Sequence, residues 1–270
     1  MIVPSMTKYQ VFKEIEADSR KVELRIAMLS DKISKVFRKC RKFPTWEYCE
    51  YTHQDTRNKY LISFYAATAK DVDKPQSDYF CLLDDGNGRL GAVKCGSLKY
   101  KKDESFNFVN TRAISLYKPH FFDRYRQRYW KGQDICYYEL ICRYFSRNKR
   151  ILPIEVDEDV KLKYEENGPL GNYWLLVNDG ICPTHQWCEG GLETIGQPDS
   201  EFISVMLYDT FLTRSILKPR QLEAIERNGR EYLITHDFAY LRSEMLKMSK
   251  EFEKLPSEIR PPLLPPQFQK

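Results

Sequence analysis

The sequence predicts an α+β fold, with antiparallel sheet(s), packed helices and a long N-terminal amphipathic helix. Three observations support this class. Residues 8–41 carry apolar side chains at three- and four-residue steps, which is the helical period. From Thr45 the apolar period changes to two, as in strands that bury one face. The segment 84–88 (Asp-Asp-Gly-Asn-Gly) then separates two apolar runs and favours a hairpin turn, because these residues tolerate positive φ.

The first helix presents one apolar stripe with charged residues between its members. The stripe consists of Val11, Ile15, Val22, Ile26, Leu29, Ile33 and Val36. A face of this kind packs against a core or against a second chain. We therefore expect residues 1–43 to form a helical segment that either covers the rest of the protein or binds a protein partner.

Strands dominate the next part of the chain. The expected ranges are 46–52, 60–68, 79–83, 90–95, 98–100, 106–109 and 112–116. The last of them runs almost directly into Pro119, which suits the first position of a helix because its missing N–H has no partner there. The sheet is therefore expected to deliver the chain into a helix that begins at its edge.

Helices and strands alternate in the remainder. The expected elements are a helix from an Asp134 N-cap to Arg147, strands at 173–177, from 181 and at 201–208, a helix from 219 to 228–229, an extended piece at 232–234, and a helix capped at 235 or 237 that reaches about 255. These elements place a single α+β domain over residues 44–255. Five prolines in residues 256–270 predict an extended or disordered tail.

The segment 115–132 (SLYKPHFFDRYRQRYWKG) combines a histidine, arginines and aromatic residues on one short helix. Helical spacing places His120, Arg124, Arg128 and Lys131 on one face. An imidazole one turn from permanent cations suits phosphate chemistry, because it exchanges a proton near neutral pH while guanidinium groups hold the anion.

Positive charge is concentrated around this segment. Residues 112–150 contain ten basic and three acidic residues, a net +7, which leaves −2 for the other residues of a chain whose total is +5. Such a concentration is the footprint expected for a polyanion. The alternative is that the acidic run at 155–166 folds back and neutralises it.

The eight cysteines are scattered through apolar patterns, so we expect buried thiols in a reducing cytoplasm. Cys182, His185 and Cys188 have a spacing that would allow three zinc ligands, but no second pair accompanies them, and a loop at a strand end is the favoured interpretation. No metal or cofactor is expected. Neither a signal peptide nor a run of ~20 apolar residues occurs, so we expect a cytoplasmic protein without a membrane span.

Familiar catalytic motifs are absent, but one partial resemblance exists. The pattern His120-x-x-x-Arg124-x-Arg126-x-Arg128, followed by the strands at 173–177 and 201–208, resembles the barnase/RelE-like microbial ribonuclease superfamily. Members place a helix with histidine or arginine against a small antiparallel sheet. The resemblance covers about a third of the chain and implies metal-independent cleavage of RNA.

The resemblance also implies roles for individual residues. His120 would be the acid/base, and Arg124 and Arg128 would stabilise the phosphate charge in the transition state. The residues implied to contact the nucleic acid are Arg126, Lys131, Arg143 and Arg147 at the backbone, with Tyr125 or Trp130 stacking on a base if exposed. The second acid/base partner stays open between Glu201, Tyr208, Thr210 and His185.

A non-catalytic protein is the alternative. In that case the basic-aromatic helix contacts RNA, another polyanion or an acidic partner, and His120 is structural. A third possibility is an interaction protein that binds its partners through the N-terminal helix and the proline-rich tail.

Overall fold

The structure is a computed structural model that describes residues 1–3, 5–101, 108–149, 151–154, 173–190 and 202–236. Within these residues the strands form one nine-stranded sheet in the order β1-β2-β3-β4-β5-β9-β8-β7-β6. The strands are β1 (Thr45–Thr52), β2 (Lys59–Ala66), β3 (Gln76–Asp84), β4 (Leu90–Lys101), β5 (Phe108–Tyr117), β6 (Ile151–Ile154), β7 (Tyr173–Val177), β8 (Gly180–Gly190) and β9 (Phe202–Tyr208). The helices are α1 (Lys8–Phe37), α2 (Pro119–Arg128), α3 (Tyr137–Arg147) and α4 (Pro219–His236), with short 3₁₀ turns η1 (Ala69–Asp71) and η2 (Arg214–Ile216).

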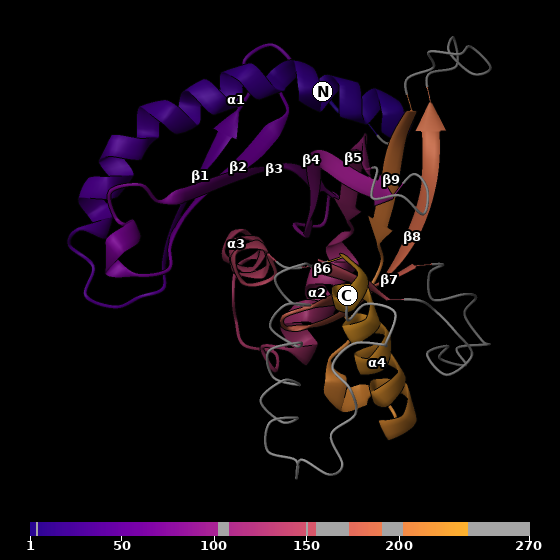
Figure 1. The fold of residues 1–270 in the computed structure, drawn as a ribbon. Helices are drawn as coiled ribbons and strands as arrows, with labels where there is room; N and C mark the ends of the chain where they lie inside the picture. The colour runs from indigo at the N-terminus through magenta and orange to yellow at the C-terminus, as the bar shows by residue number, and fades with distance from the viewer. Residues whose placement is uncertain (4, 102–107, 150, 155–172, 191–201, 237–270) are drawn as a thin grey trace, which may run out of the picture.

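The predicted α+β class is confirmed. Neighbouring strands pair antiparallel throughout, except that β5 and β9 run parallel. This parallel pair joins two antiparallel meanders, β1 to β5 and β6 to β9. The two halves of the chain therefore form one continuous sheet (Figure 1).

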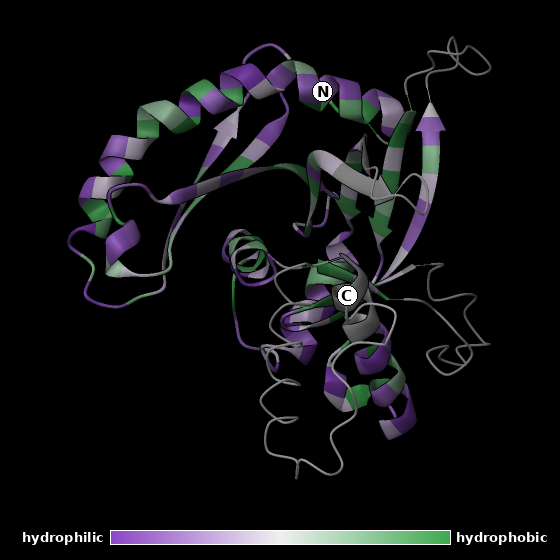
Figure 2. Ribbon diagram, in the orientation of Figure 1, coloured by the Kyte–Doolittle hydropathy of each residue, from purple (hydrophilic) through white to green (hydrophobic). Residues whose placement is uncertain are grey.

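The long N-terminal helix is also confirmed, and it lies along the convex face of the sheet (Figure 1). Thr7 caps it, because its side chain accepts a hydrogen bond from Gln10 N while the Gln10 side chain accepts one from Thr7 N. Every member of the predicted apolar stripe belongs to the core cluster between α1 and the sheet or packs against it. Figure 2 shows the resulting alternation of hydrophilic and hydrophobic residues along α1.

The opposite, concave face is covered in part by α2 and α3. Their apolar sides pack on a cluster rich in aromatic rings, in which Tyr117 stacks on Tyr208 with ring centroids 4.0 Å apart. Phe121, Phe122 and Tyr125 are fully buried on α2. Burying rings of this size contributes much of the core's stability, about 1.5–3 kcal/mol for each Phe-sized side chain.

A third cluster forms under α4, where two predictions were wrong and one strand was not predicted. Strand β6, which was not expected, pairs with β7. Helix α4 continues past Gly229 to His236, so it includes the segment expected to be extended. A Cβ on Gly229 would lie 3.3 Å from Cδ2 of Leu176, so the missing side chain serves close helix–sheet packing instead of ending the helix.

Smaller differences concern boundaries. The N-cap of α3 is Cys136 and not Asp134, and no side chain caps it. The piece expected at 98–100 is part of β4, and residues 108–109 of the piece expected at 106–109 belong to β5. The acidic run at 155–166, the helix expected beyond His236 and the proline-rich tail lie outside the described residues. Among the residues that the structure describes, no helix is both long and apolar enough to cross a membrane.

Candidate functional site

Helix α2 begins at the carboxyl end of β5, beside the carboxyl end of β9. The backbone N–H of Lys118 donates to the carbonyl of Tyr208 at 3.3 Å, which links the two strand ends. Pro119 occupies the first helical turn, as predicted. Where parallel strands end side by side at a change in strand order, the space beyond them is a frequent place for a ligand site.

The exposed face of α2 brings His120 and Arg124 together. Nε2 of His120 accepts a hydrogen bond from Nε of Arg124 at 3.2 Å, and Nη1 of Arg124 donates to Oε1 of Gln127 at 2.8 Å. Partial loss of water around the imidazole lowers the pKa of His120, and the positive charge of Arg124 lowers it further. The ring is therefore neutral at pH 7, with its lone pair directed at a guanidinium.

Arg128 extends this face by one more turn. Its Nη1 donates to the carbonyl of Phe211 and lies 3.4 Å from Oγ1 of Thr210. These contacts join the end of α2 to the segment that follows β9. Thr210, one of the four candidate acid/base partners, is thus placed beside Arg128.

A second imidazole lies at the same edge of the sheet. His185 is on β8 opposite Leu207 of β9, and its Nε2 is 3.3 Å from Oδ2 of Asp209. The other carboxylate oxygen of Asp209 contacts Nζ of Lys118 at 2.5 Å. Both His185 and Asp209 keep about a third of their side-chain surface exposed (37% and 32%). Sequence reasoning missed Asp209 and Lys118. Each of them directly follows a strand, and this position is the sequence feature that could have indicated them.

The other two candidate partners are less suitable or not described. Tyr208 is almost fully buried, and its ring packs in the aromatic cluster. Glu201 lies outside the described residues. His185 is therefore the candidate with both solvent exposure and a carboxylate to orient it.

Two of the predicted binding residues, Tyr125 and Arg147, contact the carboxylate of Asp179. The Tyr125 hydroxyl donates to Oδ2 of Asp179 at 2.7 Å, and the Arg147 guanidinium donates to both carboxylate oxygens at 2.8–3.2 Å. Burial alone would raise the pKa of Asp179. The hydrogen bonds from Arg147 and Tyr125 outweigh it, so the pKa lies below its usual value. Tyr125 and Arg147 thus stabilise the fold, and the buried ring of Tyr125 has no surface for stacking.

Arg143 and Arg126 make cation–π contacts with neighbouring rings. Arg143 pairs with Glu139 at 2.5 Å and lies 4.6 Å from the ring centroid of Trp130. Arg126 lies 4.6 Å from the ring centroid of Tyr137. Lys131 is exposed and has a positive φ of 52°. The structure therefore does not gather all nine predicted residues at one site. Only His120, Arg124 and Arg128 belong to the helix face that the spacing defined, because α2 ends at Arg128 and Lys131 lies in the turn that follows it.

Cys182, His185 and Cys188 lie within β8, and the expected loop at this position was wrong. Alternation along a strand points the two cysteines to one face and the histidine to the other. In the part of the chain that the structure describes, no cluster of His, Cys, Asp and Glu residues could hold a metal ion.

Comparison with protein-family models, with curated proteins and with solved structures gave no match for this chain.

Proposed function

We propose that this protein is a metal-independent endoribonuclease that holds RNA phosphates on the exposed face of α2. The observation that carries the proposal is the neutral imidazole of His120, exposed and adjacent to Arg124, at an edge of the sheet that also holds the His185–Asp209 pair. The resemblance of the His120–Arg128 pattern to the barnase/RelE-like ribonucleases supports it.

In the proposed reaction, His120 takes the proton of a ribose 2′-hydroxyl. The 2′-oxygen then attacks the adjacent phosphorus, which forms a 2′,3′-cyclic phosphate as the bond to the 5′-oxygen breaks. His185, oriented by the Asp209 carboxylate, is the group that gives a proton to that leaving oxygen. Arg124 and Arg128 stabilise the negative charge that grows on the phosphate.

In this scheme Arg124 changes its hydrogen-bond partner when RNA binds. In the structure its Nε occupies the lone pair of His120 that a general base needs. A bound phosphate offers the guanidinium a charge-assisted partner, which is stronger than a neutral imidazole. Binding of RNA would then free Nε2 of His120, and the imidazole could act as the general base.

We predict that His120→Ala abolishes cleavage, with a fall of about 10²–10⁴-fold for the loss of general acid–base catalysis. Gel analysis of a short labelled RNA would follow cleavage, and fluorescence anisotropy of the same RNA would follow binding. Affinity should survive, because a neutral ring contributes no charge to phosphate binding. Lys70→Ala, at an exposed lysine of η1, is the control and should cleave normally.

The pH profile gives a second measurement on the same site. Because its pKa is lowered, His120 stays unprotonated below its usual titration range near pH 6.5, and cleavage should persist there and fall only at lower pH. Arg124→Ala removes a charge that lowers this pKa, so the acid limb should move to higher pH. Wild-type cleavage by His120→Ala would refute the assignment.

Binding without cleavage is the second candidate, and the Arg124–His120 hydrogen bond favours it because that bond occupies the basic nitrogen. In this case wild-type protein binds RNA and releases no cyclic phosphate. The same two assays therefore separate the candidates.

A further inference from the structure

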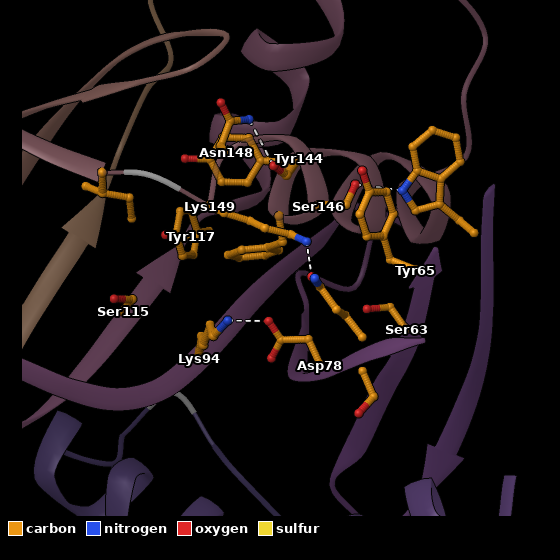
Figure 3. A pocket seen from close by; sticks show the side chains of 15 residues that line it. Ser63, Tyr65, Asp78, Lys94, Ser115, Tyr117, Tyr144, Ser146, Asn148 and Lys149 are labelled. Carbon is orange, nitrogen blue, oxygen red and sulfur yellow. Dashed lines mark hydrogen bonds and ion pairs between the residues drawn. The ribbon is translucent and has the colours of Figure 1, made fainter. Parts of the chain in front are cut away.

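A second site lies on the concave face of the sheet, away from α2. A cavity of about 330 Å³ opens between β2–β5 and the C-terminal half of α3 (Figure 3). Its floor is formed by buried residues such as Tyr117, Tyr144 and Asn148, and its rim by the exposed Gln76 and Lys149. None of its lining residues belongs to α2.

The lining is polar where packing alone would favour apolar residues. Ser63, Lys94 and Ser115 point into the cavity from three different strands. Their neighbours along those strands face α1 and are buried apolar residues, namely Ile62, Phe64, Val93, Ile114 and Leu116. Hydroxyl and ammonium groups cost free energy when they are removed from water without good partners. A concave, polar surface under a helix is therefore better suited to a ligand than to filling the core.

The charges in the cavity leave one cation without a carboxylate partner in the contacts described. Lys94 pairs with Asp78, so those two charges compensate each other. Nζ of Lys149 donates to the neutral Oε1 of Gln76 and lies 4.2 Å from the ring centroid of Tyr65. Loss of water lowers the pKa of Lys149, and the negative charges of Asp71 and Asp78 only partly oppose this effect. A ligand anion beside Lys149 would give its ammonium group a charge-assisted partner.

Aromatic rings line the wall next to this lysine. Trp46 is fixed by a 2.7 Å hydrogen bond from its Nε1 to Oγ of Ser146. Tyr65 lies near it, with ring centroids 5.8 Å apart. Such rings bind flat, unsaturated groups through stacking. The hydroxyl groups of Ser63 and Ser115 provide donors and acceptors between the rings and the floor.

We propose that this cavity binds a nucleoside monophosphate, with the phosphate at Lys149, the base against Trp46 and Tyr65, and the ribose among the hydroxyl groups. Its volume falls within the range of about 300–1,000 Å³ typical of small-molecule sites. The proposal does not rest on RNA cleavage, because the two sites share no residue.

Calorimetric titration of the full chain with uridine and adenosine 5′-monophosphates tests the proposal. Saturable 1:1 binding is expected, with weaker binding of the matching nucleosides and of inorganic phosphate. If the nucleoside binds as tightly as the monophosphate, Lys149 does not bind the phosphate group. If inorganic phosphate binds as tightly as the monophosphate, the cavity is a general anion site. Either result, or no saturable binding at millimolar nucleotide, overturns the proposal.

Variants locate the site. Lys149→Gln should weaken monophosphate binding about tenfold or more, since it removes a charge-assisted hydrogen bond, and Lys149→Arg should restore most of it. Lys32→Gln, at an exposed residue of α1 across the sheet, is the control for charge alone. Because Lys149 is exposed, circular dichroism should show all three folded. Unchanged affinity in Lys149→Gln contradicts the site, whereas His120→Ala should leave nucleotide binding intact whether or not it cleaves RNA.

Discussion

At the scale of single residues, the arginines within residues 112–150 differ in what they contact. Arg147 donates hydrogen bonds to both carboxylate oxygens of Asp179 and to the Tyr129 hydroxyl. Asp179 itself is nearly inaccessible, and its backbone N–H donates to Oδ1 of Asn148 at 2.9 Å. This network ties the end of α3 to the β7–β8 turn. Arg124, in contrast, has only neutral partners in the contacts described, which suits it to an incoming phosphate.

We predict that Arg147→Met destabilises the protein by about 3 kcal/mol, because it leaves the Asp179 carboxylate buried without its cation. The figure is at the low end of the range for buried pairs, since Arg147 keeps 32% of its side chain exposed. Urea denaturation followed by tryptophan fluorescence would measure the loss. Arg143→Met removes a more exposed pair within α3 and should cost less than about 1 kcal/mol.

The loss of stability caused by Arg147→Met should depend on pH. The folded pKa of Asp179 is lowered, so its contribution is present above the unfolded value of about 3.9 and disappears as pH falls through the folded pKa. The difference between wild type and Arg147→Met should therefore be full at pH 7 and smaller near pH 3. A difference that does not change between these pH values would contradict the assignment.

At the scale of elements, the position of α2 depends on a close approach between two strands and the helix start. A Cβ on Gly91 would lie 2.6 Å from the carbonyl oxygen of Tyr117 and 3.1 Å from Cδ of Pro119. Only a residue without a side chain allows β4 to pass this point. Gly91 thus fixes where the chain turns from β5 into α2, and hence where His120 lies.

We predict that Gly91→Ala destabilises the protein by about 1–3 kcal/mol, the usual cost of overpacking, because the contact is with backbone that has little room to move. Gly96→Ala is a matched control on the same strand, where an added Cβ meets nothing within 4 Å. Thermal unfolding would compare the two variants. Equal midpoints would show that the helix start adapts to the extra methyl group.

Helix α1 shows how one element's role depends on its partner. Its apolar stripe was compatible with either the body of the protein or a second chain. In the fold this stripe covers the sheet, and Val22 and Ile15 are essentially inaccessible. Apolar residues on its outer side, such as Met28, remain exposed.

At the scale of the whole molecule, the parallel pairing of β5 and β9 brings segments far apart in sequence to one edge. Lys118 and Asp209 are neighbours there, together with Arg128 and the carbonyl of Phe211. The local excess of +7 in residues 112–150 is therefore not all available to a ligand, since Asp179 and Asp209, which lie outside this segment, pair with Arg147 and Lys118.

We predict a modest salt dependence of RNA affinity for this reason. If Arg124, Arg128 and Lys131 neutralise roughly three phosphates, the slope of log affinity against log salt should be about −2 on single strands. Arg124→Ala should reduce its magnitude by about 0.7, and the exposed Lys39→Ala on the far side of the sheet should not change it. Anisotropy titrations at several salt concentrations would give the slope. A flat response would exclude phosphate binding on this face.

Patterns with a short repeat were enough to predict much of the fold. The stripe of α1, the strands β1 to β5, the hairpin turn at 84–88 and the proline at the start of α2 are local signals, and each was confirmed. Predictions failed where a distant neighbour decides the conformation. Gly229 continues a helix because it meets Leu176, and β6 exists because β7 pairs with it.

The sequence by itself determined the class of fold and the helix face that carries His120, Arg124 and Arg128, because the periods of strands and helices are properties of the local chain. Only the tertiary structure decided which charges are paired and which groups share a site. It placed Arg147 on Asp179, His185 beside Asp209, and Lys149 at a polar cavity. Such contacts depend on strand order and packing between distant segments, and neither leaves a periodic mark in the sequence.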